Sequence, residues 1–317
     1  MAFLVITALV AIKEHDLFAV VMLFGIYSFL TAVLFMDLDA VDVAFTEAAV
    51  GAGISTVLML GTLRLTGRFE KKQRRNPALP LLVVCVTGAA LLYGMTDMPA
   101  FGDPMAPIHT HMAPRFIQDS PTEIGVPNMV TSVLASYRGY DTLGETMVIF
   151  TAGLAVLLLL GMREGQNRRP GRTAIGDVLV LRVVVKVLIS FILLYALYVQ
   201  FHGDYGAGGG FQAGVVFATA FVIYDLVFGE ADVRRVLPSL WLSRLAVLGI
   251  LIYAGTGVAC MLLGHPFLDY SALAHDPVHG QHLGILLVEL GVGITVFSVI
   301  LTIFYAFSGL RRPQVSA

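Results

Sequence analysis

Long runs of apolar residues, separated by short polar segments, follow one another along the whole chain. A bilayer crossing takes about 20 apolar residues at a rise of about 1.5 Å per residue. Eight runs reach this length, at residues 17–36, 43–63, 79–95, 142–162, 178–201, 209–229, 240–263 and 282–307. The apolar positions are continuous and do not alternate with a period of two, which predicts helices and not the strands of a membrane barrel.

Residues 1–12 form a ninth apolar run. A helix of this length reaches only about 18 Å, whereas the hydrocarbon core is about 30 Å thick. The run lacks the basic start and the small-residue cleavage site of a signal peptide. We therefore expect a short or tilted first helix, which brings the total to about nine spans, eight of them full length.

The composition agrees with this pattern. Of the 317 residues, 57% are hydrophobic and 13% are charged, and the mean hydropathy is +0.83. A soluble domain carries about 25% charged residues. These values exclude a soluble, disordered or collagen-like chain and predict an all-α polytopic helical bundle in the inner (cytoplasmic) membrane of the cell. Cys85 and Cys260 lie inside apolar runs, which indicates buried thiols and neither a zinc site nor a disulfide framework.

Lysine and arginine are distributed unevenly between the two sides of the predicted bundle. Arg115 and Arg138 fall on one side, and the other side receives the basic groups within residues 64–75, 163–172, 234–244 and 311–312. Basic loops remain in the cytoplasm, so we predict a cytoplasmic C-terminus and outward-facing loops at 96–141 and 264–281. The net charge of −2 indicates no nucleic-acid partner.

All eight histidines lie in loops or at the ends of spans. A haem inside a helix bundle needs axial ligands within the spans, so a membrane cytochrome is excluded. The histidines of the outer loops match no ligand pattern of a known type of metal site: His109, His111, His275, His279 and His282. We predict solvated loop histidines and neither a metal nor a cofactor.

Four ionisable residues lie inside the predicted spans, where a charge costs at least about 2.5–3.5 kcal/mol. We interpret them as candidates for an ion-translocation path: Glu145, Glu47, Lys186 and Glu289. A structural alternative remains open for each. Glu145 is one turn into its span and could cap the helix or extend to the interface, and Lys186 could pair with a carboxylate that holds two helices together.

A glycine-rich segment, His202–Gly214, joins two predicted spans. It is not a P-loop, since no Gly-Lys-Ser/Thr follows, and it is not a dinucleotide-binding fingerprint, since no βαβ unit surrounds it. Consecutive glycines permit a tight turn, and glycines four residues apart form a small face for helix packing. We expect a re-entrant turn packed against a neighbouring helix through Gly208, Gly209, Gly210 and Gly214.

Three segments resemble one family of membrane complexes. His202–Gly214 resembles the signature of the B subunit of Mrp-type multisubunit sodium/proton antiporters, with Ala207 where the family has proline. Pro127–Glu145 is similar both to the E-type subunit of membrane-bound hydrogenases and to the C-terminal part of the large A-type subunit of the antiporters. Val41–Ala52 looks like the D-type subunit. The resemblance implies a fusion of three units: a D-type three-helix unit at 1–75, an E-type two-helix unit with a long outer loop at 76–170, and a B-type four-helix unit at 171–317.

The resemblance implies a non-catalytic membrane subunit of a complex that exchanges or pumps Na⁺ and H⁺, with other antiporter-type membrane subunits as partners and no cofactor of its own. It carries over Glu145 and Glu47 as ionisable positions, whereas Lys186 and Glu289 rest on the physical argument alone. The alternative is a purely structural subunit of a hydrogenase- or complex I-like assembly whose ion path lies elsewhere. A stand-alone enzyme is not indicated, because the sequence shows no nucleophile–base pair, metal cluster or phosphate loop.

Overall fold

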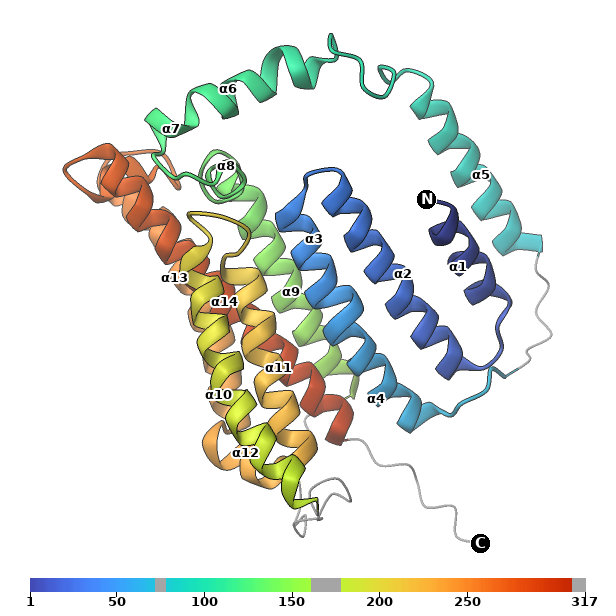
Figure 1. The fold of residues 1–317 in the computed structure, drawn as a ribbon. Helices are drawn as coiled ribbons and strands as arrows, with labels where there is room; N and C mark the ends of the chain where they lie inside the picture. The colour runs from blue at the N-terminus through green and yellow to red at the C-terminus, as the bar shows by residue number, and fades with distance from the viewer. Residues whose placement is uncertain (72–77, 161–177, 310–317) are drawn as a thin grey trace, which may run out of the picture.

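The computed structural model describes residues 1–71, 78–160 and 178–309. Within these ranges the chain consists of helices and their connections, with one isolated bridge between Asp16 and Phe69. Figure 1 shows the long helices side by side and roughly parallel to one another. The predicted joints at 64–78 and 163–176 and the arginines of the tail lie wholly or partly outside the described residues.

Eight helices of the described chain are long and apolar enough to cross a membrane, which confirms the eight predicted spans. They are α2 (Leu17–Asp37), the continuous helix of α3 (Val41–Glu47), the π-helical η1 (Ala48–Ser55) and α4 (Thr56–Thr66), and then α5 (Ala78–Met95), α9 (Gly139–Leu160), α10 (Leu179–His202), α11 (Gly210–Phe228), α13 (Ser239–Leu262) and α14 (Pro277–Gly309). The ninth apolar run forms α1 (Ala2–Lys13), a helix of 12 residues.

Helix α14 lies at the centre of the most tightly packed part of the bundle, against α9, α11 and α13. Over half of its span is buried inside the chain, whereas no residue of α5 is buried. The expectation of a buried thiol is therefore wrong for Cys85, which is exposed on α5, whereas Cys260 on α13 is buried. Glycines bring these helices together: a Cβ on Gly249 of α13 would lie 2.5 Å from the carbonyl oxygen of Gly291 on α14. Close packing of small residues is what associates helices in lipid, since the surrounding tails are as apolar as the side chains.

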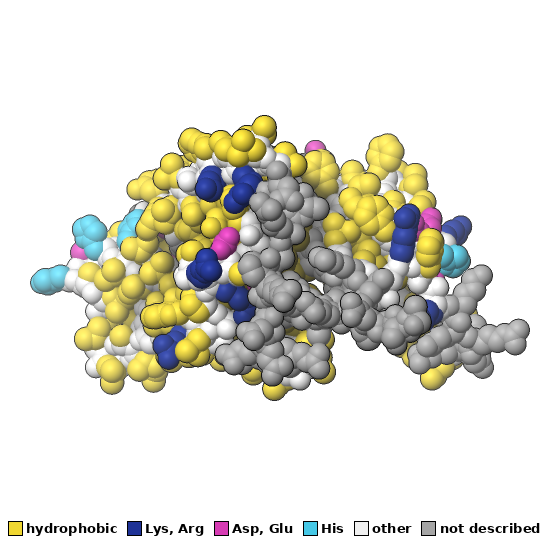
Figure 2. All heavy atoms as spheres, turned by 90° about the horizontal axis from the view of Figure 1, so that it is seen from below, with side chains coloured by type: hydrophobic (Ala, Val, Ile, Leu, Met, Phe, Trp, Pro, Cys, Tyr) yellow, Lys and Arg dark blue, Asp and Glu magenta, His cyan; other side chains and the backbone are white. Residues whose placement is uncertain are grey.

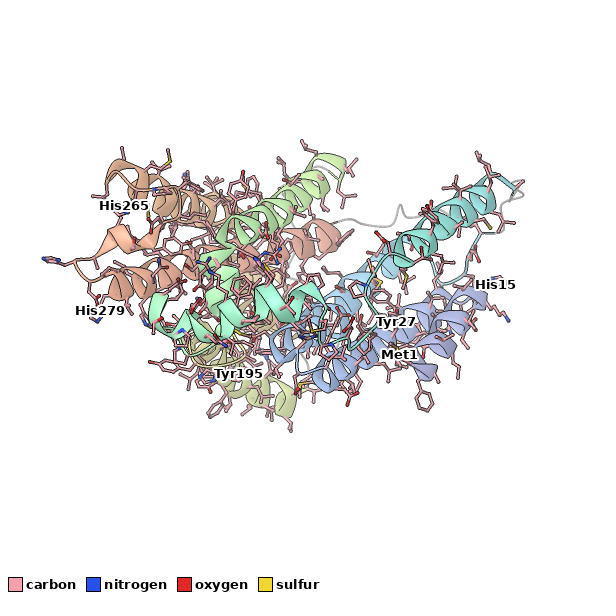
Figure 3. The ribbon with its side chains drawn as sticks, turned by 90° about the horizontal axis from the view of Figure 1, so that it is seen from above. Met1, His15, Tyr27, Tyr195, His265 and His279 are labelled. Carbon is pink, nitrogen blue, oxygen red and sulfur yellow. The ribbon has the colours of Figure 1, made fainter. Side chains whose placement is uncertain are left out.

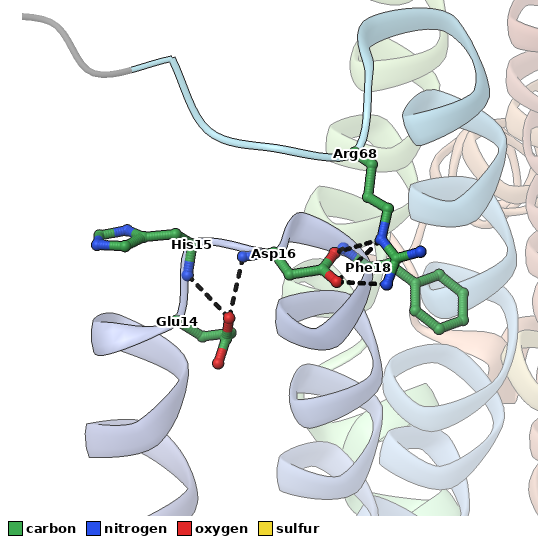
Figure 4. A network of polar contacts seen from close by, with 5 residues as sticks. All are labelled: Glu14, His15, Asp16, Phe18 and Arg68. Atoms are coloured by element: carbon green, nitrogen blue, oxygen red, sulfur yellow. Dashed lines mark hydrogen bonds and ion pairs between the residues drawn. The ribbon is translucent and has the colours of Figure 1, made fainter.

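The N-terminal helices form a second packed group. Gly51 of η1 faces α2, because a Cβ there would lie 2.6 Å from the Ser28 hydroxyl. At the lower end of this group, the Arg68 guanidinium pairs with Asp16 at 2.6 Å, as Figure 4 shows. This cation holds the pKa of the Asp16 carboxyl below its usual value. The pair therefore ties the start of α2 to the segment that follows α4.

The two ends of the bundle differ in their connections. The upper end in Figure 1 carries the turn 203–209 and several short helices, namely η2 (Ile108–Met112), α6 (Ala113–Gln118), α7 (Ser120–Glu123), α8 (Met129–Thr131), η3 (Ser132–Tyr137) and η4 (Tyr270–Leu273). The lower end carries α12 (Glu230–Val236). Lys and Arg side chains are exposed on the lower end, as Figure 2 shows.

The labelled histidines are spread over the molecule. Seen from above in Figure 3, His265 and His279 lie at one edge and His15 at the opposite edge. His265 pairs with Asp269 at 3.0 Å and His279 with Asp276 at 2.8 Å. Among the residues that the structure describes, no group of three or more His, Cys, Asp or Glu is placed to hold a metal ion.

Candidate functional site

The glycine-rich turn 203–209 reverses the direction of the chain between α10 and α11, and its backbone packs closely against the end of α10. The N–H of Gly209 donates to the carbonyl of Val199 at 3.0 Å, and Gly209 has a φ of +107°. A Cβ on Gly208 would lie 2.7 Å from that same carbonyl oxygen. Glycine tolerates both the positive φ and the close approach, which is why the turn can fold back onto α10.

The first turn of α11 touches the backbone of α14. A Cβ on Gly210 would lie 1.9 Å from the carbonyl oxygen of Glu289, and a Cβ on Gly214 would lie 2.6 Å from that of Gly293. The structure thus places the small face Gly210–Gly214 directly on α14. This crossing also fixes the position of the Glu289 side chain.

The Glu289 carboxylate lies over the glycine turn. Its Oε1 is 2.9 Å from the Cβ position of Gly209, and its Oε2 is 3.1 Å from that of Gly203. The side chain is half-buried, and Asp204 and Asp42 are near enough to act on it electrostatically. The N-terminus of α11 begins beside it, and the partial positive charge of a helix N-terminus favours an anion.

Helix α3 approaches the same turn from the N-terminal group. The N–H of Gly208 donates to Oδ1 of Asp42 at 3.1 Å. One turn further along, Nε2 of Gln212 donates to the Thr46 hydroxyl at 2.9 Å. These contacts join α3 to the glycine turn and to the first turns of α11.

The segment before α9 closes the turn from above. Nδ2 of Asn128 donates to the carbonyls of Gly203 and Gly206 at 3.1 and 2.9 Å, and the Thr131 hydroxyl donates to the Gly203 carbonyl at 2.6 Å. The backbone N–H of Asn128 also donates to the carbonyl of Asp204 at 2.9 Å. All three sequence segments that resemble the family therefore meet around Glu289.

Two further polar groups adjoin this site. Nδ1 of His282 lies 3.5 Å from Oδ2 of Asp204. Burial raises the pKa of the Asp204 carboxyl above its usual value, and the nearby His282 imidazole opposes that rise. Gln200 of α10 is only 5% exposed, and its Nε2 has no hydrogen-bond partner in the described part of the chain.

Glu47 lies apart from this site, at the junction of α3 and η1. It is half-buried, and its Oε1 and the Ser28 hydroxyl both lie close to the Cβ position of Gly51, at 2.5 and 2.6 Å. The π-helical turns begin directly after it. Such irregular turns inside a helix occur frequently at functional positions.

The other two candidates are exposed on the surface of this chain. Glu145 is exposed on α9, and Lys186 is exposed on α10. Nζ of Lys186 lies 5.6 Å from the ring centre of Phe228, and it forms no ion pair with the described residues. The structure therefore does not bring the four predicted ionisable residues together.

Sequence reasoning did not assign Asp204, His282, Asn128, Thr131 or Gln200 to a site, and it treated His282 as a solvated loop histidine, whereas this residue lies on α14. The first two carried a weak signal, since Asp204 follows His202 in the glycine motif and His282 is two turns from Glu289. The others are ordinary polar residues, and only the packing of distant segments places them at the turn.

Comparison with known proteins agrees with this arrangement of segments. Residues 2–68 match the family of the D subunit of MBH, and residues 73–179 match that of the E subunit of MBH. Residues 180–302 match a domain related to the MnhB subunit of Na⁺/H⁺ antiporters. A protein of Staphylococcus haemolyticus (strain JCSC1435), named antiporter subunit mnhB2, is 40% identical over 135 residues, which cover 41% of this chain and 94% of that protein.

This chain belongs to the Mrp-type antiporter family. It is a fused D/E/B-type subunit, as the resemblance of its three motifs predicts. A protein of Rhizobium meliloti (strain 1021), named as the A/B subunit of a K(+)/H(+) antiporter, is 28% identical over 96% of the fused subunit. The fused subunit spans only 33% of the length of that protein.

Solved structures share its fold. The fused subunit superposes on a chain of the Mrp complex from Dietzia sp. DQ12-45-1b with a TM-score of 0.75 and 26% identity, covering 99% of its own residues and 35% of that chain. A chain of the membrane-bound sulfane sulfur reductase, an archaeal respiratory membrane complex, gives a TM-score of 0.55 and 27% identity, with 72% of the present residues and 96% of that chain covered. Both neighbours come from multisubunit membrane complexes.

Proposed function

We propose that this Mrp-type subunit contributes intramembrane acids to the path of a cation (Na⁺)/proton antiporter module and packs against larger antiporter subunits. The observation that carries the proposal is the position of Glu289, half-buried in a membrane-spanning helix at the meeting point of three segments. No described lysine or arginine pairs with it. A carboxylate without a fixed counter-ion is free to bind a proton or a monovalent cation.

The exposed candidates, Glu145 and Lys186, suit a position at an interface with another subunit of the complex. A charge that faces lipid costs at least about 2.5–3.5 kcal/mol, and both Glu145 and Lys186 are exposed on this chain. We place them where a neighbouring antiporter-type subunit completes the path, with Glu47 and Glu289 inside the chain. Helix α5, which buries none of its residues, offers a further surface for such a neighbour.

The orientation and the division into units are parts of the same proposal. Basic side chains are exposed at the lower end (Figure 2), where α12 carries Arg234 and Arg235 in its last turn (Figure 1), and they support a cytoplasmic position for that end and for the C-terminus. The turn 203–209 then faces outward. The units 1–75, 76–170 and 171–317 would correspond to three pieces that are separate in other assemblies.

The test is cation-dependent proton movement in membrane vesicles that contain the whole complex. We expect Glu289→Gln, which keeps the shape and removes the titration, to abolish the exchange. Glu145→Gln should also abolish it, at the boundary between subunits, while Glu145→Asp retains part. Asp97→Asn is the control, because this carboxylate is exposed in a connection outside the spans. Parallel additions of Na⁺ and K⁺ identify the cation.

All variants must first assemble normally on a native gel. Wild-type exchange by assembled complexes that carry Glu289→Gln and Glu145→Gln would contradict the proposal. The chain would then be a scaffold, with the ion path elsewhere in the complex.

A further inference from the structure

Three titratable side chains follow one another from the upper end of the bundle inward. His282 and Glu289 lie on the same side of α14, two turns or about 10.5 Å apart. Asp204 pairs with His282 at 3.5 Å, and its side chain and that of His282 are 24% and 35% exposed. The pair is thus in contact with solvent at the upper end, whereas Glu289 lies within the span.

The glycine turn connects the pair to Glu289. Asp204 directly follows Gly203, whose Cβ position is 3.1 Å from Oε2 of Glu289. Because Gly203 has no side chain, the Glu289 carboxylate can lie directly against the backbone of the turn, one residue before Asp204. Asp204 also acts electrostatically on Glu289.

An independent observation at Gln200 points to a further polar group or an ordered water below the glycine turn. Gln200 is 5% exposed, and its Nε2 lacks a hydrogen-bond partner among the described residues. Its Oε1 lies 2.7 Å from the Cβ position of Gly293, one turn along α14 from Glu289. A buried amide donor left without a partner is unfavourable, so an ordered water or a polar ligand beside Glu289 would satisfy this group.

The charged and titratable groups around the pair and Glu289 come from five elements. They are Asp42 on α3, His202 on α10, Asp204 itself in the turn, Tyr253 on α13, and His282 and Glu289 on α14. The segment before α9 adds the neutral groups Asn128 and Thr131. Acids and imidazoles therefore surround the turn, and no described lysine or arginine forms an ion pair with any of them.

We propose that the Asp204–His282 pair exchanges protons between the water at the upper end and Glu289. This inference rests on the proposed function and names the outer part of its path. A proton that arrives on Asp204 leaves its carboxyl oxygen and binds a carboxyl oxygen of Glu289, so that Asp204 becomes a carboxylate again. The reverse step returns the proton to water, and no electron is transferred.

The residue types suit this task. Burial raises the pKa of Asp204 and brings its protonation closer to neutral pH. The neighbouring His282 imidazole favours the carboxylate form of Asp204. The two groups together therefore make proton uptake depend on the pH of the water that they contact.

The experiment uses vesicles of a single orientation that contain the complete complex, with the pH varied separately on each side. For the wild type we expect a rate that depends on the pH at the side of the turn 203–209. Asp204→Asn should lower the rate at least about tenfold, and His282→Gln should keep exchange but displace the pH profile by about one unit. His279→Gln is the matched control, because this histidine of α14 is highly exposed and, among the described residues, forms an ion pair only with Asp276.

The outcomes separate this inference from the proposed function. Wild-type rates and profiles in Asp204→Asn and His282→Gln, together with an inactive Glu289→Gln, would overturn the proton-exchange pair and leave the proposed function standing. A fully active Glu289→Gln complex would overturn this inference and remove Glu289 from the proposed path, and the Glu145→Gln complex would then decide the proposed function. If Asp204→Asn does not assemble on a native gel, the test rests on the pH profile of the His282→Gln complex. An unchanged pH profile in this variant contradicts the inference.

Discussion

Replacing Gly210 by alanine should force α11 away from α14. The added Cβ would lie 1.9 Å from the carbonyl oxygen and 2.8 Å from the carbonyl carbon of Glu289, and 3.0 Å from the nitrogen of Gly293. All three are backbone atoms, so none can rotate away. Ordinary contact begins at 3.4 Å, and the two helices must separate by about 1.5 Å to reach it.

The cost of this separation can be bounded. Overpacking of a tight interior costs about 1–3 kcal/mol, and the neighbouring contact of Gly214 with Gly293 is lost in addition. The gain in helix propensity from glycine to alanine is at most about 1 kcal/mol, and it is smaller here because Gly210 is the first residue of α11. We expect a net loss of about 1–2 kcal/mol, or roughly 5 °C in the Tm.

The measurement is the fraction of purified complex that remains assembled on a native gel after heating. Gly255→Ala is the matched control, since it lies inside α13 and a Cβ there meets nothing within 4 Å. The control should be as stable as the wild type or slightly more so. If Gly210→Ala matches the control in thermal stability, the backbone contact between α11 and α14 is not as close as described, and the placement of Glu289 over the turn fails with it.

Two further changes test the contacts around the bundle. Asn128→Ala removes the amide that donates to Gly206 at 2.9 Å; the unpaired carbonyl should cost about 1–3 kcal/mol, measured as a lower Tm of the complex. Arg68→Gln should lower thermal stability slightly at neutral pH, because the ion pair with Asp16 is exposed. Arg68 lowers the pKa of Asp16 from its usual 3.8, so this contribution is present above that value and is lost as the pH falls through the lowered pKa. A difference between variant and wild type that persists in acid would contradict this account.

The positions of the long helices are predictable because hydropathy is a local property. A run such as 240–263 must be a spanning helix whatever surrounds it, since every backbone group in lipid needs a partner inside its own segment. The helix ends are less well predicted: the run at 142–162 becomes the helix Gly139–Leu160, and the last helix starts at Pro277 where the apolar pattern indicates 282. At these ends, polar residues extend the helix beyond the apolar run. A hydropathy pattern does not detect this extension.

The candidate site, unlike the positions of the long helices, is not predictable from a local property of the sequence. In sequence, Glu145 and Glu289 look alike, since each carboxylate lies one or two turns inside an apolar run. In the structure Glu145 is exposed on α9, and Glu289 is half-buried over Gly203 and Gly209. The direction in which a helix residue points, relative to its neighbours, depends on which helices pack together and at what angle.

The membrane class, the eight spanning helices and the family can all be read from the chain alone, because apolar length, composition and short motifs need no partner. Helix packing, by contrast, brings Asp42, Asn128, Asp204 and His282 to one glycine turn beside Glu289. These residues come from segments up to about 250 positions apart, and the free energy that joins them arises from helix contacts formed after each helix exists. No local pattern encodes such contacts, so the site appears only when the bundle is assembled.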